Sequence, residues 1–188
     1  MRVVGFGAST AQGMRDDEGG GFVARIGRRL EAEGLGTSEN FGIGGETTDQ
    51  MVERARTVVT NPGDQVVVTL GINDVARDPD RIPDRRVPLD RHRSNVESIL
   101  RTFVDAGCRV GYLTQYPVDF AKHGLDPALV ESYIQAGRDA AAAVGVDLID
   151  VHSQIDDALY DQFIFRDGMH FNGEGHEFIT QRVWEWLT

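Results

Sequence analysis

The side chain best suited to nucleophilic chemistry is Ser9, which follows an apolar run in the order Gly-Phe-Gly-Ala-Ser. Glycines let the backbone turn sharply at the end of a strand, so such a hydroxyl can be exposed for attack on a carbonyl. A phosphate-binding turn and a plain strand–helix connection are the alternatives. However, the segment lacks the third glycine of the dinucleotide fingerprint, and no Lys-Ser/Thr pair follows to make a P-loop.

Two further segments can supply donors to the oxyanion that forms when a nucleophile attacks an ester. Residues 40–48 contain three glycines after a strand-like run, which frees a backbone N–H to point into a cleft. Residues 70–74 close the most apolar run with Asn73, whose amide can donate, and with Asp74, which can brace the loop. A flexible turn and an Asn-Asp turn without a catalytic role are the alternatives.

A fourth segment, near the C-terminus, places Asp167 and His170 three residues apart in one loop. If this loop folds over the edge of a sheet, the imidazole can take the proton of a serine hydroxyl. The carboxylate then fixes the tautomer and stabilises the imidazolium. Taken separately, a surface aspartate and a packed histidine are the alternative interpretation.

Alternation of apolar runs and stretches of helical period indicates the elements that position these segments. Strands are predicted at Val3–Phe6, Ser38–Phe41, Gln65–Leu70, Arg109–Thr114 and Asp147–Asp150. Helices are predicted at Phe22–Glu33, Thr48–Val59, Leu89–Ala106, Ala128–Val144 and Glu174–Leu187. The pattern predicts one three-layer α/β domain over residues 1–188, with a five-stranded parallel sheet.

Two irregular stretches, Val75–Pro88 and Tyr116–Leu125, leave the carboxyl ends of predicted strands, the edge where open α/β sheets place their sites. The first is rich in proline and in charged residues of both signs. A solvated charged loop is the favoured interpretation, and a substrate rim or a subunit contact is the alternative.

Composition excludes several classes of partner. The net charge of −11 supplies no basic face for nucleic acid and disfavours an anionic membrane surface. The chain enters a strand pattern at once, and no apolar run approaches the ~20 residues of a membrane span, so a cytoplasmic protein is expected. The oligomeric state stays open.

The single cysteine and the other four histidines are not expected to form a second reactive site. Cys108 lies in an apolar run and is predicted to be a buried, unreactive thiol. His176 is predicted to pack or cap within a helix, and His92, His123 and His152 are predicted to be surface residues, with substrate contact by His123 as an alternative. No cluster has zinc-ligand spacing, so no metal is expected.

Together, the four segments resemble the SGNH hydrolases, the GDSL-type esterase/lipase superfamily, over the whole chain. By this resemblance, Ser9 is the nucleophile, His170 the base and Asp167 its partner, while Gly45, Asn73 and the N–H of Ser9 form the oxyanion hole. The resemblance also implies a flavodoxin-like sheet of order 2-1-3-4-5, with no metal or cofactor.

The expected activity is therefore hydrolysis of short-chain acyl or acetyl esters of small molecules or sugars. The natural ester stays open, since the family also includes thioesterases and lysophospholipases. A non-catalytic flavodoxin-like binding module is the alternative from another class. One departure from the family is Ala8, where the first block usually has aspartate. We expect it to alter local hydrogen bonding and to leave catalysis intact.

Overall fold

The sheet of this protein contains five parallel strands. The computed structural model describes residues 1–70, 72–75 and 86–188. The strands are β1 (Arg2–Gly7), β2 (Thr37–Gly42), β3 (Gln65–Thr69), β4 (Arg109–Leu113) and β5 (Asp147–Ile149). Their spatial order is β2-β1-β3-β4-β5, which confirms the predicted fold. The order reverses at β1, so the loops after β1 and β3 flank the crevice where such sheets bind ligands.

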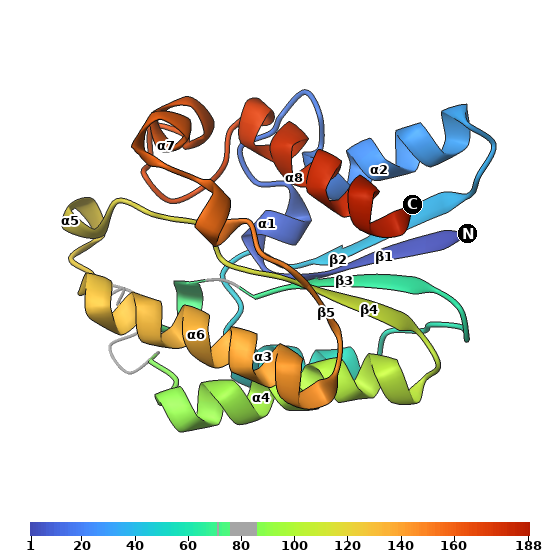
Figure 1. The fold of residues 1–188 in the computed structure, drawn as a ribbon, viewed down its shortest axis with the longest axis horizontal. Coiled ribbons are helices and arrows are strands. Elements are labelled where there is room, and N and C mark those ends of the chain that lie inside the picture. Colours follow the sequence, from blue (N-terminus) through green and yellow to red (C-terminus); the bar gives the residue numbers. More distant parts are fainter. Residues whose placement is uncertain (71, 76–85) are drawn as a thin grey trace.

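Helices cover both faces of the sheet (Figure 1). On one face lie α1 (Ser9–Gln12), α2 (Gly21–Ala32) and α8 (Gly173–Leu187). On the other lie α3 (Thr48–Ala55), α4 (Leu89–Asp105) and α6 (Pro127–Val144). The short helices α5 (Phe120–His123) and α7 (Asp157–Phe163) follow β4 and β5, and 3₁₀ turns occupy η1 (Ile72–Asp74) and η2 (His152–Gln154).

Two apolar clusters, one on each face, explain why the central strands are apolar throughout. Val3 and Val67 belong to the cluster under α2 and α8. Their neighbours Val4, Val66 and Val68 belong to the cluster over α3, α4 and α6. Successive side chains of a strand point to opposite faces, and here each face is buried, so no polar alternation is present.

Most predicted helices are present, and their ends follow local chemistry. Asp126 caps α6 by accepting from the N–H of Ala128, and Gly145 ends the helix with φ of 80°. The prediction that the third helix reaches Val59 was wrong, because α3 ends at Ala55. The β-branched run that follows is a poor helix former, and the N–H and hydroxyl of Thr57 both bond to the carbonyl of Arg54.

Within the described residues, no helix has both the length and the apolar character needed to cross a membrane.

Candidate functional site

Ser9 lies at the carboxyl end of β1, as the first residue of α1. The turn beneath it requires glycine at position 7, because a Cβ there would lie 2.0 Å from the carbonyl oxygen of Thr69 on β3. Gly13 ends the short helix with φ of 85°. These constraints hold Ser9 at the carboxyl end of β1, beside β3.

His170 lies within hydrogen-bond distance of this serine, and Asp167 lies within hydrogen-bond distance of His170. His170 Nε2 is 3.2 Å from Ser9 Oγ, and His170 Nδ1 is 2.9 Å from Asp167 Oδ2. The other carboxylate oxygen, Oδ1, accepts from the backbone N–H groups of Met169 and His170 at 2.9 and 3.0 Å. A hydroxyl, an imidazole and a carboxylate in this order have the geometry of a base-activated nucleophile.

The electrostatic state of Asp167 suits this arrangement. Burial raises the pKa of its carboxyl group. The hydrogen bonds from Met169, His170 and Arg15 outweigh burial, and the pKa falls to about 2. Asp167 is therefore an anion at every pH where an imidazole titrates, and it can stabilise an adjacent imidazolium.

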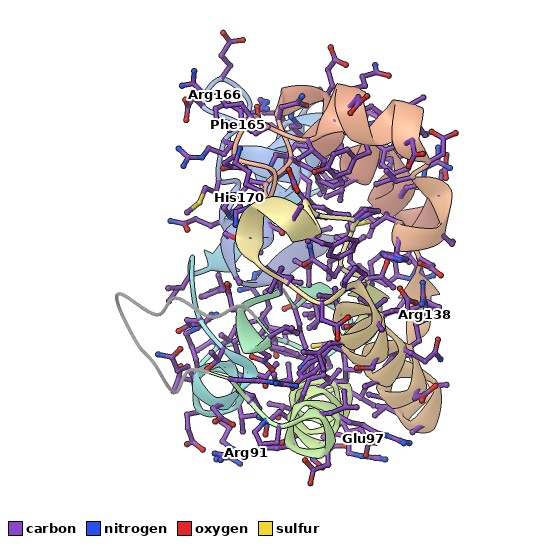
Figure 2. All side chains as sticks on the ribbon, turned by 90° about the vertical axis from the view of Figure 1, so that its left-hand side faces the viewer. Arg91, Glu97, Arg138, Phe165, Arg166 and His170 are labelled. Carbon is purple, nitrogen blue, oxygen red and sulfur yellow. The ribbon has the colours of Figure 1, made fainter. Side chains whose placement is uncertain are left out.

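The loop that carries Asp167 and His170 is held by the short helix α5. Three successive carbonyls of the loop, those of residues 166, 167 and 168, accept from the Lys122 ammonium, the His123 ring and the Asp119 N–H at 2.6, 2.9 and 2.7 Å. His123, predicted to be a surface residue, is partly buried, and its Nε2 bonds to the Asp167 carbonyl. Figure 2 looks onto this face, with His170 below Phe165 and Arg166.

The glycine-rich loop after β2 and the loop that carries Asn73 meet beside α1. Asn73 donates from its side-chain amide to the carbonyl of Glu46, at 2.8 Å, which ties the loop after β3 to the loop after β2. Gly45 has φ of 81°, a left-handed conformation that favours glycine. The Gly44 N–H donates to Gln12 Oε1 at 2.8 Å, which links the same loop to α1.

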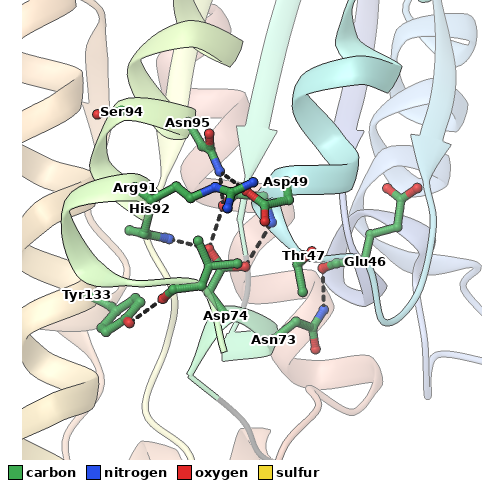
Figure 3. A network of polar contacts seen from close by, with 12 residues as sticks. Glu46, Thr47, Asp49, Asn73, Asp74, Arg91, His92, Ser94, Asn95 and Tyr133 are labelled. Atoms are coloured by element: carbon green, nitrogen blue, oxygen red, sulfur yellow. Dashed lines mark hydrogen bonds and ion pairs between the residues drawn. The ribbon is translucent and has the colours of Figure 1, made fainter. Parts of the chain in front are cut away.

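A buried polar network lies behind the loops that follow β2 and β3 (Figure 3). The carboxylate of Asp74, which is 1% exposed, accepts from the Thr48 N–H at 2.8 Å and from its hydroxyl at 2.6 Å. His92 Nδ1 on α4 lies 2.6 Å from the same carboxylate. Asn95 extends the network by donating to Thr48 Oγ1. Asp74 thus joins the loop after β3 to the start of α3 and to α4, and the prediction that it can brace the loop agrees with these bonds.

The prediction that His92 lies on the surface was wrong, since it is 4% exposed. The signal that would have found it is the period of α4. His92, Val96, Ile99 and Phe103 recur at helical spacing and form one buried face. A polar residue on that stripe needs a buried partner, and Asp74 supplies it.

Arg54 is a second residue that the sequence analysis missed. Its guanidinium donates to the carbonyls of Phe41 and Gly7 at 2.7 and 3.0 Å, and to the carboxylate of Glu46 at 2.7 Å. It thereby joins the ends of β1 and β2 beneath the site. Ala8 is 2% exposed and packs in the same apolar cluster as Phe6.

Other predicted residues lie away from the reactive groups or outside the described part of the chain. His176 is 1% exposed, which confirms a packing role, and burial lowers its pKa. Cys108 is a buried free thiol, as predicted. Arg77, Arg81 and Arg85 of the charged loop fall outside the described residues. Over the described ranges, no group of three or more His, Cys, Asp or Glu side chains is arranged to hold a metal ion.

Comparisons with known proteins identify a family and solved structures with the same fold. The model of the GDSL-like lipase/acylhydrolase family matches residues 6–178. A human isoamyl acetate-hydrolyzing esterase 1 homolog is 22% identical over 133 residues, which cover 63% of this chain and only 53% of that protein. The chain thus matches about half the length of this relative.

Two solved structures have the same fold over nearly the whole chain. The lipase/acylhydrolase from Enterococcus faecalis has a TM-score of 0.80 at 22% identity, covering 99% of this chain and 94% of that one. An acetylxylan esterase from Geobacillus stearothermophilus has a TM-score of 0.80 at 20% identity, covering 98% and 92%.

Proposed function

The chain belongs to the GDSL-like lipase/acylhydrolase family, and we propose that it is a serine esterase that hydrolyses short-chain acyl esters through Ser9. The observation that carries the proposal is the hydrogen-bonded series Ser9–His170–Asp167, at 3.2 and 2.9 Å. The family supports ester hydrolysis, and the series supports the roles of these three residues.

In the first half of the reaction, Ser9 Oγ attacks the ester carbonyl while its proton moves to His170 Nε2. The tetrahedral intermediate collapses, the bond to the leaving alcohol breaks, and His170 returns the proton to that alcohol. In the second half, water attacks the acyl-enzyme and gives its proton to His170. The bond to Ser9 then breaks, the carboxylic acid leaves, and the proton returns to Ser9 Oγ.

The oxyanion of each intermediate is stabilised by the N–H groups of Ser9 and Gly45 and by the side-chain amide of Asn73. Ser9 opens α1, and the first N–H groups of a helix are not used within the helix. One amide hydrogen of Asn73 bonds to the Glu46 carbonyl, and this bond orients the amide. A side-chain amide carries two N–H hydrogens, and the second is the one that we assign to the oxyanion. Donors held in place before the reaction lose little free energy to reorganisation, and this is the basis of their effect.

The loops around the site favour substrates with a short acyl chain. Apolar side chains in a loop can form a trough for a long chain only if they are exposed. Four of the apolar residues described in these loops face the interior instead, since Val75, Val87, Val118 and Tyr116 are all at most 4% exposed, while Phe120 and Leu125 are partly buried. The names of two relatives, an acetylxylan esterase and an isoamyl acetate-hydrolyzing esterase homolog, also denote acetate esters.

Labelling with a fluorophosphonate tests the proposal, because only an activated serine reacts with this probe. The wild-type protein should be labelled on Ser9 and should hydrolyse p-nitrophenyl acetate. Ser9→Ala should abolish labelling and lower kcat by at least about 10³-fold, while Ser153→Ala, at an exposed serine of η2, serves as the control. Labelling at another serine would overturn the assignment, and an unlabelled wild-type protein would favour a binding module.

A further inference from the structure

Asp167 has a second partner that the proposed reaction does not use. Its Oδ2 oxygen, which lies 2.9 Å from His170 Nδ1, also lies 3.0 Å from the Nε of Arg15. A carboxylate oxygen can accept more than one hydrogen bond, so the imidazole and the guanidinium share the same negative charge. Both nitrogens touch one oxygen, so they lie no more than about 6 Å apart, the sum of the two distances.

The backbone of Arg15 is fixed in an unfavourable conformation. Within the described residues, Arg15 is the only non-glycine residue with positive φ, at 72°. Its neighbours hold it there. The Met14 N–H donates to the Ser9 carbonyl at 3.0 Å, and the buried carboxylate of Asp16 accepts from two glycine N–H groups and pairs with Arg25. Such conformations persist where the surrounding structure fixes them, and they concentrate at functional sites.

The side chain of Arg15 has a second contact besides Asp167. Its guanidinium carbon lies 5.3 Å from the centre of the Phe165 ring, in the loop that carries Asp167. The side chain is 47% exposed, yet a carboxylate and an aromatic ring both constrain it. Arg15 therefore joins the segment that follows the nucleophile to the loop that carries the base.

We propose that Arg15 is a positioning residue of the esterase site that acts through Asp167: by sharing the Asp167 carboxylate, it disfavours protonation of His170. This inference rests on the proposed function. A carboxylate bound to a guanidinium stabilises an imidazolium less than a free carboxylate does, and the cation also repels the imidazolium directly. The arginine thus extends the working range of the base toward lower pH.

Other charged groups also lie around the Asp167–His170 pair: Asp119 caps α5, the Lys122 ammonium donates to the Arg166 carbonyl, and the Arg166 guanidinium lies over Phe165. Among the described residues, however, the Asp167 carboxylate bonds to Arg15, Met169 and His170 and to none of these three. Burial raises the pKa of Tyr116 to about 12 and raises that of Tyr160, so both phenols are neutral. His176, packed beneath the site, has a pKa lowered by burial. His123 bonds to the backbone carbonyl of Asp167, whereas Arg15 and His170 bond to its carboxylate.

The test is the titration midpoint of the His170 ring, measured by NMR with the signal assigned from a His170→Asn variant. Arg15→Met keeps a Cβ and a stem of comparable length, so it leaves the constraint on the backbone unchanged. Its midpoint should lie about 0.5–1 pH unit above that of the wild type, the size expected for a half-exposed charge at this distance. The shift should shrink in 1 M NaCl, and Arg15→Lys should restore part of the wild-type value.

Arg166→Met is the matched control. Its guanidinium lies 5.3 Å from the same ring, as that of Arg15 does, and makes no bond to Asp167. The midpoint should move by less than half as much as in Arg15→Met. Equal shifts in both variants would overturn the proposal, because they would indicate a general field of cations rather than the shared carboxylate.

Kinetics give an independent readout. In Arg15→Met the acid limb of kcat/KM for p-nitrophenyl acetate should move with the NMR midpoint, while KM stays unchanged. A changed KM with an unmoved midpoint would overturn the proposal and make Arg15 a substrate-binding residue. The NMR titration needs no turnover, so a wild-type protein without esterase activity would refute the proposed function while the midpoints still decide the role of Arg15.

Discussion

Replacing Asp74 with alanine tests whether the buried network behind the loops that follow β2 and β3 holds these loops in place. The carboxylate is 1% exposed and accepts three bonds, two from Thr48 and one from His92. Breaking a buried pair by removing one partner costs about 3–5 kcal/mol, because the other partner stays buried without compensation. For a domain of this size, 1 kcal/mol corresponds to about 2–4 °C in Tm, so Asp74→Ala should lower Tm by about 6–20 °C.

Asp49→Ala is the matched control, because Asp49 belongs to the same network (Figure 3) but lies at its solvent end. It pairs with Arg91 at 2.8 Å, and the two side chains are 34% and 61% exposed. Exposed pairs contribute about 0–1 kcal/mol, so its Tm should fall by less than about 4 °C. Thermal unfolding followed by circular dichroism measures both variants.

A double-mutant cycle with His92→Leu separates the pair from the packing around it. If the His92–Asp74 contact carries the effect, the double variant should be more stable than the sum of the single losses by at least about 1 kcal/mol. The Asp74→Ala enzyme should also lose about 10²-fold in kcat, since Asn73 and Gly45 would no longer be held. Equal losses of Tm in Asp74→Ala and Asp49→Ala would refute the reasoning.

Three further results are expected. Asn73→Ala should lower kcat by roughly 10²–10³-fold, about 3–4 kcal/mol, with little change in KM, and a variant that loses mainly affinity would make Asn73 a binding residue. Because the pKa of Asp167 is lowered to about 2, the stability it contributes is present above about pH 4 and is lost as the pH falls toward 2. The acid limb of activity therefore reports His170, and Asp167→Asn should lower kcat and move this limb to lower pH, so an unmoved limb would exclude Asp167 as the partner. Acetyl to butyryl p-nitrophenyl esters should have a higher kcat/KM than octanoyl or longer ones in a C2–C16 series, and an optimum at C10 or above would contradict the short-chain site.

Local sequence patterns were sufficient to predict the sheet and helices of this protein and to select the candidate reactive residues. The all-apolar run of β3 predicts a strand buried on both faces, and the structure agrees. The strand–helix alternation brings Ser9 and Asn73 to one edge of the sheet, because the carboxyl ends of parallel strands share that edge. The spacing of Asp167 and His170 was equally informative, since both lie in one loop and need no distant segment to meet.

Only the tertiary structure identifies the residues that support the site. His123 and Arg15 are separated by 44 and 152 residues from the loop that they hold, and His92 is 18 residues from Asp74. No periodicity links such pairs, because periodicity reports only which face of one element is apolar. Their contacts exist because the sheet order places α5 and the segment after α1 on either side of the Asp167 loop. A half-exposed arginine and a histidine in a short helix therefore look like surface residues in the sequence, and only the packed chain gives them a partner.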